Sequence, residues 1–132
     1  MKGDTVLRIV RAVLRTSAGI IVVRAPGELH WRFVEVRLAW ADRDIERAIA
    51  AVIELETGIA LPPARLERIS RSGRIATYAA AVDDITVMTH IRSIGMDGTS
   101  VKELTYAEAA AGVGLAEETL VFLRTHSLLT PP

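Results

Sequence analysis

The chain has 132 residues, half of them hydrophobic, and a mean hydropathy of +0.29, so we expect one domain, 1–132, with a sizeable core. Sixteen basic and sixteen acidic residues cancel, which leaves no overall field to attract nucleic acid or an acidic membrane surface. The absence of cysteine excludes disulfides and thiolate catalysis. No apolar run approaches the ~20 residues of a membrane span, and no signal-peptide pattern opens the sequence, so we expect a cytoplasmic protein.

The first third of the sequence is typical of β-structure. Residues 5–15 alternate imperfectly and predict a strand, although their apolar spacing is also compatible with a helix. Residues 19–24, GIIVVR, are a β-branched run that predicts a buried strand, and 25–27 supply a turn. Residues 30–38 alternate apolar and polar side chains and are expected to hold one or two short strands.

An amphipathic helix is predicted over residues 42–57. Its apolar side chains follow helical spacing at Ile45, Ala48, Ile49, Val52, Ile53 and Leu55. Asp42 or Asp44 can cap its start. Gly58 can adopt the left-handed conformation in which helices commonly end.

Strands resume after this helix. Leu61-Pro62-Pro63 predicts an extended connection, because a residue before proline is disfavoured in the helical region. Two strands are expected at 65–69 and 74–82, joined by a hairpin-like turn at 70–73. A further strand pattern covers 85–94.

The C-terminal part predicts two short helices, at 106–111 and 117–126, after a loop at 95–99. Strands that segregate in this way around a few helices indicate an α+β layered domain. The last segment also has the rhythm of a helix-turn-helix, but Leu120 and Phe122 stand where a DNA-reading helix needs exposed polar side chains. We therefore expect a helix packed on the sheet and no nucleic-acid partner.

The helix and its surroundings resemble the signature box of the Nudix hydrolase superfamily. When the end of the box is anchored on Gly58-Ile59, Glu56 falls on its last Glu. The other box positions that the family fills with Glu, Arg or Gly carry different residues here: Leu55, Val52, Ala51, Arg43 and Arg37. The family's Pro-Gly-Gly is replaced by Val34-Glu35-Val36. The resemblance implies a Nudix-like α/β/α sandwich, with a mixed sheet, the signature helix at about 42–57 and a C-terminal helix.

These departures bear on the reaction that the resemblance implies. In the family, Glu side chains at i, i+3 and i+4 share one helix face and hold a divalent metal against a diphosphate. The same spacing here selects Val52, Leu55 and Glu56, and Arg43 adds a positive charge. Magnesium prefers several oxygen ligands, so we expect no metal, no other cofactor and no metal-dependent diphosphate hydrolysis.

Glu56 is the candidate catalytic residue, as a general acid or base in a pocket partly shielded from water. The alternative is a helix-end carboxylate that is solvated or paired with Arg32, Arg37 or Arg43. The candidate substrate-binding residues flank it on the helix or lie on neighbouring strands and loops: Val52, Leu55, Glu35, Arg37, Arg43 and His90.

Each of these candidates also has a structural interpretation. His90 could point into a pocket from a strand, or it could simply be exposed or hydrogen-bonded. The alternation of Glu35 with valines favours a solvent-facing strand position. Asp83-Asp84 could supply a base or a ligand, but an Asp pair between strands is more often part of a turn.

Three functions are compatible with these patterns. The first is an enzyme that acts without metal on a small organic substrate through Glu56, for example in a specialised bacterial biosynthetic pathway. The second is a non-catalytic Nudix-like module that binds a nucleotide-like ligand or a protein partner. The third is a residual hydrolase that gathers metal from Glu56, Glu54, Asp83 or Asp84. Apolar strands and the C-terminal helix could also support a homodimer.

Overall fold

The computed structural model describes residues 7–39, 44–83 and 98–132. The chain runs through β1 (Leu7–Arg15), β2 (Gly19–Arg24), β3 (Val34–Ala39), α1 (Ile45–Thr57), a 3-10 helix η2 (Pro63–Arg65), β4 (Glu67–Ser72), β5 (Ile75–Ala81), β6 (Ser100–Thr105), α3 (Tyr106–Ala110) and α4 (Glu117–Thr125). None of the helices in the described part of the chain is long and apolar enough to cross a membrane.

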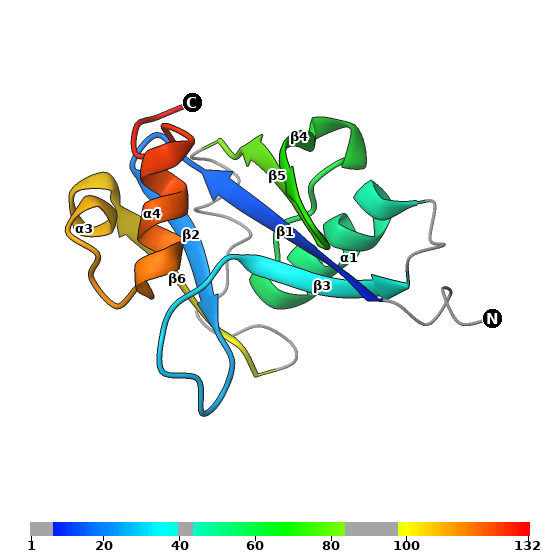
Figure 1. The fold of residues 1–132 in the computed structure, drawn as a ribbon, viewed down its shortest axis with the longest axis horizontal. Coiled ribbons are helices and arrows are strands. Elements are labelled where there is room, and N and C mark those ends of the chain that lie inside the picture. The colour runs from blue at the N-terminus through cyan, green and yellow to red at the C-terminus, as the bar shows by residue number, and fades with distance from the viewer. Residues whose placement is uncertain (1–6, 40–43, 84–97) are drawn as a thin grey trace.

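The six strands of the described ranges form one mixed sheet with β1 at its centre (Figure 1). The main order is β4-β5-β1-β2-β6, and β3 pairs with the first part of β1. β1 runs parallel to β5, whereas its pairings with β2 and β3 are antiparallel. This mixture of strand directions confirms the expected mixed sheet.

Helices cover both faces of the sheet, which confirms the predicted α/β/α layering (Figure 1). On one face, Ile49 and Ile53 of α1 are fully buried against the sheet. On the other face, Ala109 of α3 and Leu123 of α4 pack against a second apolar cluster. Strand alternation supplies both cores, because successive side chains of β2 enter opposite clusters.

The end of α1 follows the prediction closely. Gly58 takes a φ of +85° and its N–H donates to the Glu54 carbonyl at 2.9 Å. The Thr57 hydroxyl donates to the Ile53 carbonyl at 2.6 Å and accepts from the Ile59 N–H at 3.1 Å. Asp44 precedes the helix but its side chain makes no capping hydrogen bond, and Asp42 lies outside the described residues.

The expected boundaries of one strand and of the turn after it need correction. β4 begins at Glu67 and continues to Ser72, so the turn contains Gly73 and Arg74 in place of residues 70–73. The reason is the pairing of Ser72 with Ile75, which leaves two residues for the loop. β6 was not predicted, and the 85–94 strand lies outside the described residues. Residues 30–38 contain β3 and, before it, isolated bridges at Trp31 and Arg32.

Candidate functional site

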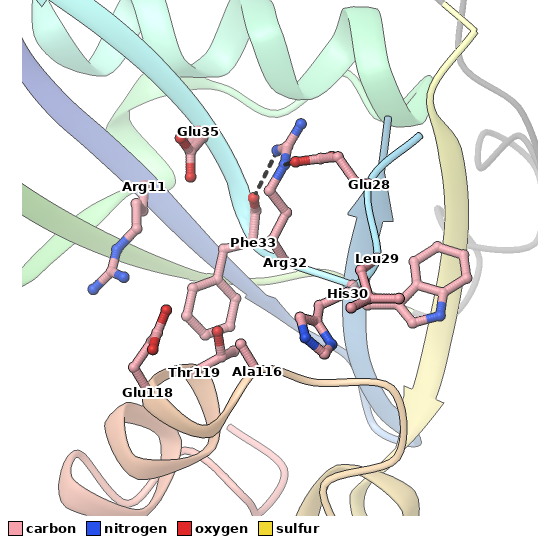
Figure 2. Close-up of a pocket in the computed structure, with 11 residues that line it drawn as sticks. Arg11, Glu28, Leu29, His30, Arg32, Phe33, Glu35, Ala116, Glu118 and Thr119 are labelled. Carbon is pink, nitrogen blue, oxygen red and sulfur yellow. Dashed lines mark hydrogen bonds and ion pairs between the residues drawn. The ribbon is translucent and has the colours of Figure 1, made fainter. Parts of the chain in front are cut away.

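A cleft of about 350 Å³ lies on the α4 side of the sheet (Figure 2). This first cleft is lined by residues 28–33, by Arg11 and Glu35 of the sheet, and by three residues at the start of α4: Ala116, Glu118 and Thr119. The volume falls in the lower part of the range of small-molecule sites, ~300–1,000 Å³. Its lining combines aromatic rings with two guanidinium groups and three carboxylates.

Arg32 is held by acidic partners at the edge of this cleft. Its Nε donates to both carboxylate oxygens of Glu28, at 3.0 and 3.1 Å, and its Nη1 donates to the Phe33 carbonyl at 3.1 Å. Figure 2 shows the Arg32 side chain turned toward Glu28 and away from Glu118. The same Nη1 lies 4.0 Å from Oε1 of Glu56. The charge of Arg32 is therefore already balanced by protein carboxylates.

In Figure 2, Arg11 and Arg32 lie on opposite sides of Phe33, and Arg11 reaches the cleft from the centre of the sheet. Its Nε and Nη2 donate to Oγ1 of Thr77 at 3.2 and 3.1 Å, and its guanidinium lies over the ring of Phe122 at 4.7 Å. Partial burial lowers the pKa of Arg11, while the opposing charge of Glu35 raises it. Arginine remains protonated under such shifts, so the cleft has a fixed cation here.

Trp31 forms one wall of the first cleft and is fixed from two directions. Its backbone N–H donates to the Gly114 carbonyl at 2.9 Å, and the guanidinium of Arg24 lies over its indole at 4.5 Å. Gly114 has a φ of +69°, and a Cβ at that position would lie 2.8 Å from Cδ1 of Trp31. Only glycine therefore allows this close approach of backbone and ring.

Glu56 is buried, with 7% of its surface exposed, so it is not a fully solvated helix-end carboxylate. Its ionic partner Arg32 is one of the three arginines that the sequence offered. Glu56 does not line the first cleft. Arg32, which lies at the edge of the cleft, contacts its carboxylate. Val52 packs against the core beneath α1, whereas Leu55 is 45% exposed.

Of the remaining candidates, Glu35 and Arg37 belong to the described part of the chain. Glu35 lines the first cleft, and Arg37 is exposed on the same strand outside it. Arg43 and His90 lie outside the described residues. The proposed roles of all these residues in binding stay predictions.

Sequence reasoning missed Arg11 and Glu118, which face the same cleft from β1 and α4. A usable signal for Arg11 was present, because it interrupts an apolar face of its strand between Ile9 and Val13. No comparable signal existed for Glu118, which belongs to a polar first turn of α4.

The residues at the box positions do not fit a magnesium ion. Val52 and Leu55 carry no side-chain oxygen, and the Glu56 carboxylate lies beside the Arg32 guanidinium. Elsewhere in the described ranges, no three His, Asp or Glu side chains gather into a group that could hold a metal.

No model of a known protein family matches the sequence, and no curated protein matches it significantly. Solved structures do match. The Nudix domain of Shewanella oneidensis NrtR, in complex with ADP-ribose, is 18% identical with a TM-score of 0.68, over 92% of this chain and 87% of that one. The MutT protein of Methanosarcina mazei is 11% identical with a TM-score of 0.65, over 95% of each chain.

A Nudix-family hydrolase of Clostridium perfringens is similar to the same extent, with 10% identity and a TM-score of 0.65 over 92% of this chain and 96% of that one. At such identities the likeness concerns the fold. The chain therefore has the Nudix fold, as the resemblance of its sequence predicted.

Proposed function

We propose that this Nudix-fold protein binds a small organic molecule of low charge in the first cleft and has lost metal-dependent diphosphate hydrolysis. The observation that supports this proposal is the balance of charges in the cleft. Its two guanidinium groups face three carboxylates, those of Glu28, Glu35 and Glu118. Arg32 is also close to a fourth carboxylate, that of Glu56.

A diphosphate would be poorly accommodated by this arrangement. Bringing two or three negative charges into the cleft would require either a bound cation or arginines that are not already neutralised. Arg32 is engaged by Glu28, and the carboxylates of Glu35 and Glu118 line the same cleft as Arg11. A neutral molecule avoids this electrostatic cost and can still use the surfaces of Trp31 and Phe33.

A fragment screen tests where and what the protein binds. The isotope-labelled protein is titrated with neutral, anionic and cationic fragments, and binding is followed through the indole N–H of Trp31 and backbone amides of residues 28–33. We expect the strongest saturable shifts from neutral aromatic fragments. The control is Arg47→Ala, an exposed change on α1 outside the cleft, which should leave those shifts intact.

Two outcomes would overturn the proposal. One is that no fragment shifts residues 28–33. The other is that anionic fragments with phosphate groups bind there more tightly than neutral ones, which would mean that the arginines, not the carboxylates, determine selectivity.

The second candidate ligand is nucleotide-like, since the Nudix domain of Shewanella oneidensis NrtR was solved with ADP-ribose. The aromatic walls of the first cleft suit a stacked base, whereas its carboxylates oppose a pyrophosphate. Titration with adenosine and with ADP-ribose separates recognition of the base from recognition of the pyrophosphate. If the base is recognised, adenosine binds at least as tightly as ADP-ribose.

The catalytic form of the proposal assigns general acid–base chemistry to Glu56. It is supported by the burial of this carboxylate and by its 4.0 Å separation from Arg32, a residue that lines the first cleft. The variant Glu56→Gln keeps the shape and removes the charge. Once the fragment screen has identified a turned-over substrate, this variant should abolish turnover and retain binding, and unchanged turnover would exclude the role.

A further inference from the structure

A second cleft, of about 390 Å³, lies on the far side of Arg11 from the first. Arg11 and Glu118 line both clefts. The polar and aromatic lining of the second cleft comes from β4, β5 and α4: Ser70, Ser72, Thr77, Glu118, Phe122 and His126. Neither the sequence patterns nor the proposed function above uses this space.

The floor that connects the two clefts is a row of polar side chains across four strands. Arg11 stands opposite Glu35 of β3 and opposite Thr77 of β5. Thr77 in turn stands opposite Ser70 of β4. Side chains at directly paired positions project from the same face of a sheet, so these four form one continuous polar row on the α4 side.

The row retains hydrogen-bonding capacity that the described residues do not use. Arg11 donates only to Thr77 among them, which leaves N–H groups on its Nη atoms without an acceptor there. Glu35 and Glu118 make neither a hydrogen bond nor a close ion pair with any residue that the structure describes. Both clefts therefore offer acceptors and donors side by side.

This combination selects among ligand groups by their hydrogen-bonding type. A phosphate only accepts, so in the second cleft it would meet Arg11 favourably but face the Glu118 carboxylate. An ammonium group only donates, so it would face the Arg11 guanidinium. A hydroxyl donates and accepts, and it can be satisfied by Arg11, by the carboxylates and by the serine hydroxyls together.

The aromatic wall suits the other surface of such a ligand. The rings of Phe122 and His126 lie against each other, with centroids 4.2 Å apart and planes inclined by 39°, and both line the second cleft beside the polar row. An unsubstituted ring face can pack against these aromatic side chains while the hydroxyl groups at its edge reach Arg11 and Ser70.

We propose that the second cleft binds the hydroxyl-bearing ring of an uncharged molecule, of the sugar or cyclitol class. The inference rests on the proposed function, because a single ligand that contacts Arg11 and Glu118 extends from one cleft into the other. Arg11 is its specificity-determining residue, and Ser70 and Glu118 are its hydroxyl partners.

Nuclear magnetic resonance on the ¹⁵N-labelled full chain tests this assignment through the Nε–H of Arg11. The probes are myo-inositol and methyl glucoside as neutral hydroxylated rings, cyclohexanol as a ring with a single hydroxyl, and inorganic pyrophosphate as an anion. We expect saturable shifts of Arg11 with the two polyhydroxylated rings, and weaker shifts with cyclohexanol and pyrophosphate.

Variants assign the effect to the cleft. Ser70→Ala and Glu118→Gln should each weaken binding by about fivefold, the equivalent of one lost hydrogen bond. Thr125→Val, which removes an exposed hydroxyl of α4 outside both clefts, should leave it unchanged. An undisturbed amide spectrum of each variant confirms that it folds.

The inference is overturned if neither polyhydroxylated ring shifts Arg11, or if pyrophosphate binds more tightly than both. The outcomes that overturn this inference can be distinguished from the outcomes that overturn the proposed function. Fragments that shift residues 28–33 while no hydroxylated ring shifts Arg11 leave the proposed function standing and remove this inference. The reverse pattern removes the proposed function.

Discussion

At the scale of single residues, the close approach of Gly114 to Trp31 determines the shape of one wall of the first cleft. We predict that Gly114→Ala destabilises the protein by about 1–2 kcal/mol because alanine disfavours the left-handed backbone conformation at this position. The clash of the added Cβ with the indole should destabilise it further. Gly27→Ala is the matched control, because Gly27 has a φ of +86° but no atom within 4 Å of its added Cβ. Chemical denaturation followed by tryptophan fluorescence measures both effects.

The comparison isolates the ring contact. The loss of stability for Gly114→Ala should exceed that for Gly27→Ala, and the native emission of the tryptophans should change only for Gly114→Ala. Equal losses would show that Trp31 moves aside without resistance, and the cleft wall would then be adaptable.

At the scale of elements, α3 begins with a reciprocal capping arrangement between Thr105 and Glu108. The Thr105 hydroxyl accepts from the Glu108 N–H at 3.1 Å, and the Glu108 carboxylate accepts from the Thr105 N–H at 3.0 Å. We predict that Thr105→Ala lowers the free energy of unfolding by about 1 kcal/mol. Urea denaturation of the variant and the wild type at neutral pH measures this difference in the free energy of unfolding.

The same cap predicts a pH dependence. The hydrogen bonds to Thr105 lower the pKa of Glu108 below its ordinary value of 4.5. A carboxyl whose folded pKa is depressed stabilises the fold above its unfolded pKa, and this contribution is lost as the pH falls through the folded pKa. Glu108→Gln should therefore lose less stability on acidification than the wild type.

Elements differed in how far they could be predicted. α1 was predictable because its apolar spacing, its length and Gly58 are all local signals that agree. β6 was not, because Val101 and Leu104 are its only buried residues of apolar type and its pairing with β2 is a long-range contact. The first cleft was equally hidden, since Arg11 and Glu118 are brought together only by the packing of α4 on the sheet.

At the scale of the whole molecule, each of the two tyrosines makes a hydrogen bond between the sheet or one of its turns and a helical layer. The Tyr78 hydroxyl donates to Glu46 of α1 at 3.1 Å, and the Tyr106 hydroxyl donates to the Thr16 carbonyl at 2.6 Å. Burial raises the pKa of both phenols, and the nearby carboxylate of Glu46 raises that of Tyr78 further. Both tyrosines are therefore neutral donors across the physiological range.

A raised tyrosine pKa contributes stability that is fully present below the unfolded value, about 10, and is lost as the pH rises through the folded value. We predict an alkaline loss of stability that begins near pH 10 and is reduced in Tyr78→Phe. At neutral pH this variant should be destabilised by about 1 kcal/mol through the missing hydrogen bond. An unchanged alkaline profile in Tyr78→Phe would contradict the role of this phenol.

We propose that this Nudix-fold chain no longer handles a metal-bound diphosphate, because Val52 and Leu55 bring no side-chain oxygen to the box positions and Arg32 lies 4.0 Å from the Glu56 carboxylate. Thermal unfolding with ADP-ribose, in the presence and absence of magnesium, tests it most directly. Ligands that bind the native state raise the melting temperature by mass action. We predict that magnesium and ADP-ribose, alone or together, leave the melting temperature unchanged. A clear stabilisation by ADP-ribose that depends on magnesium would contradict the claim.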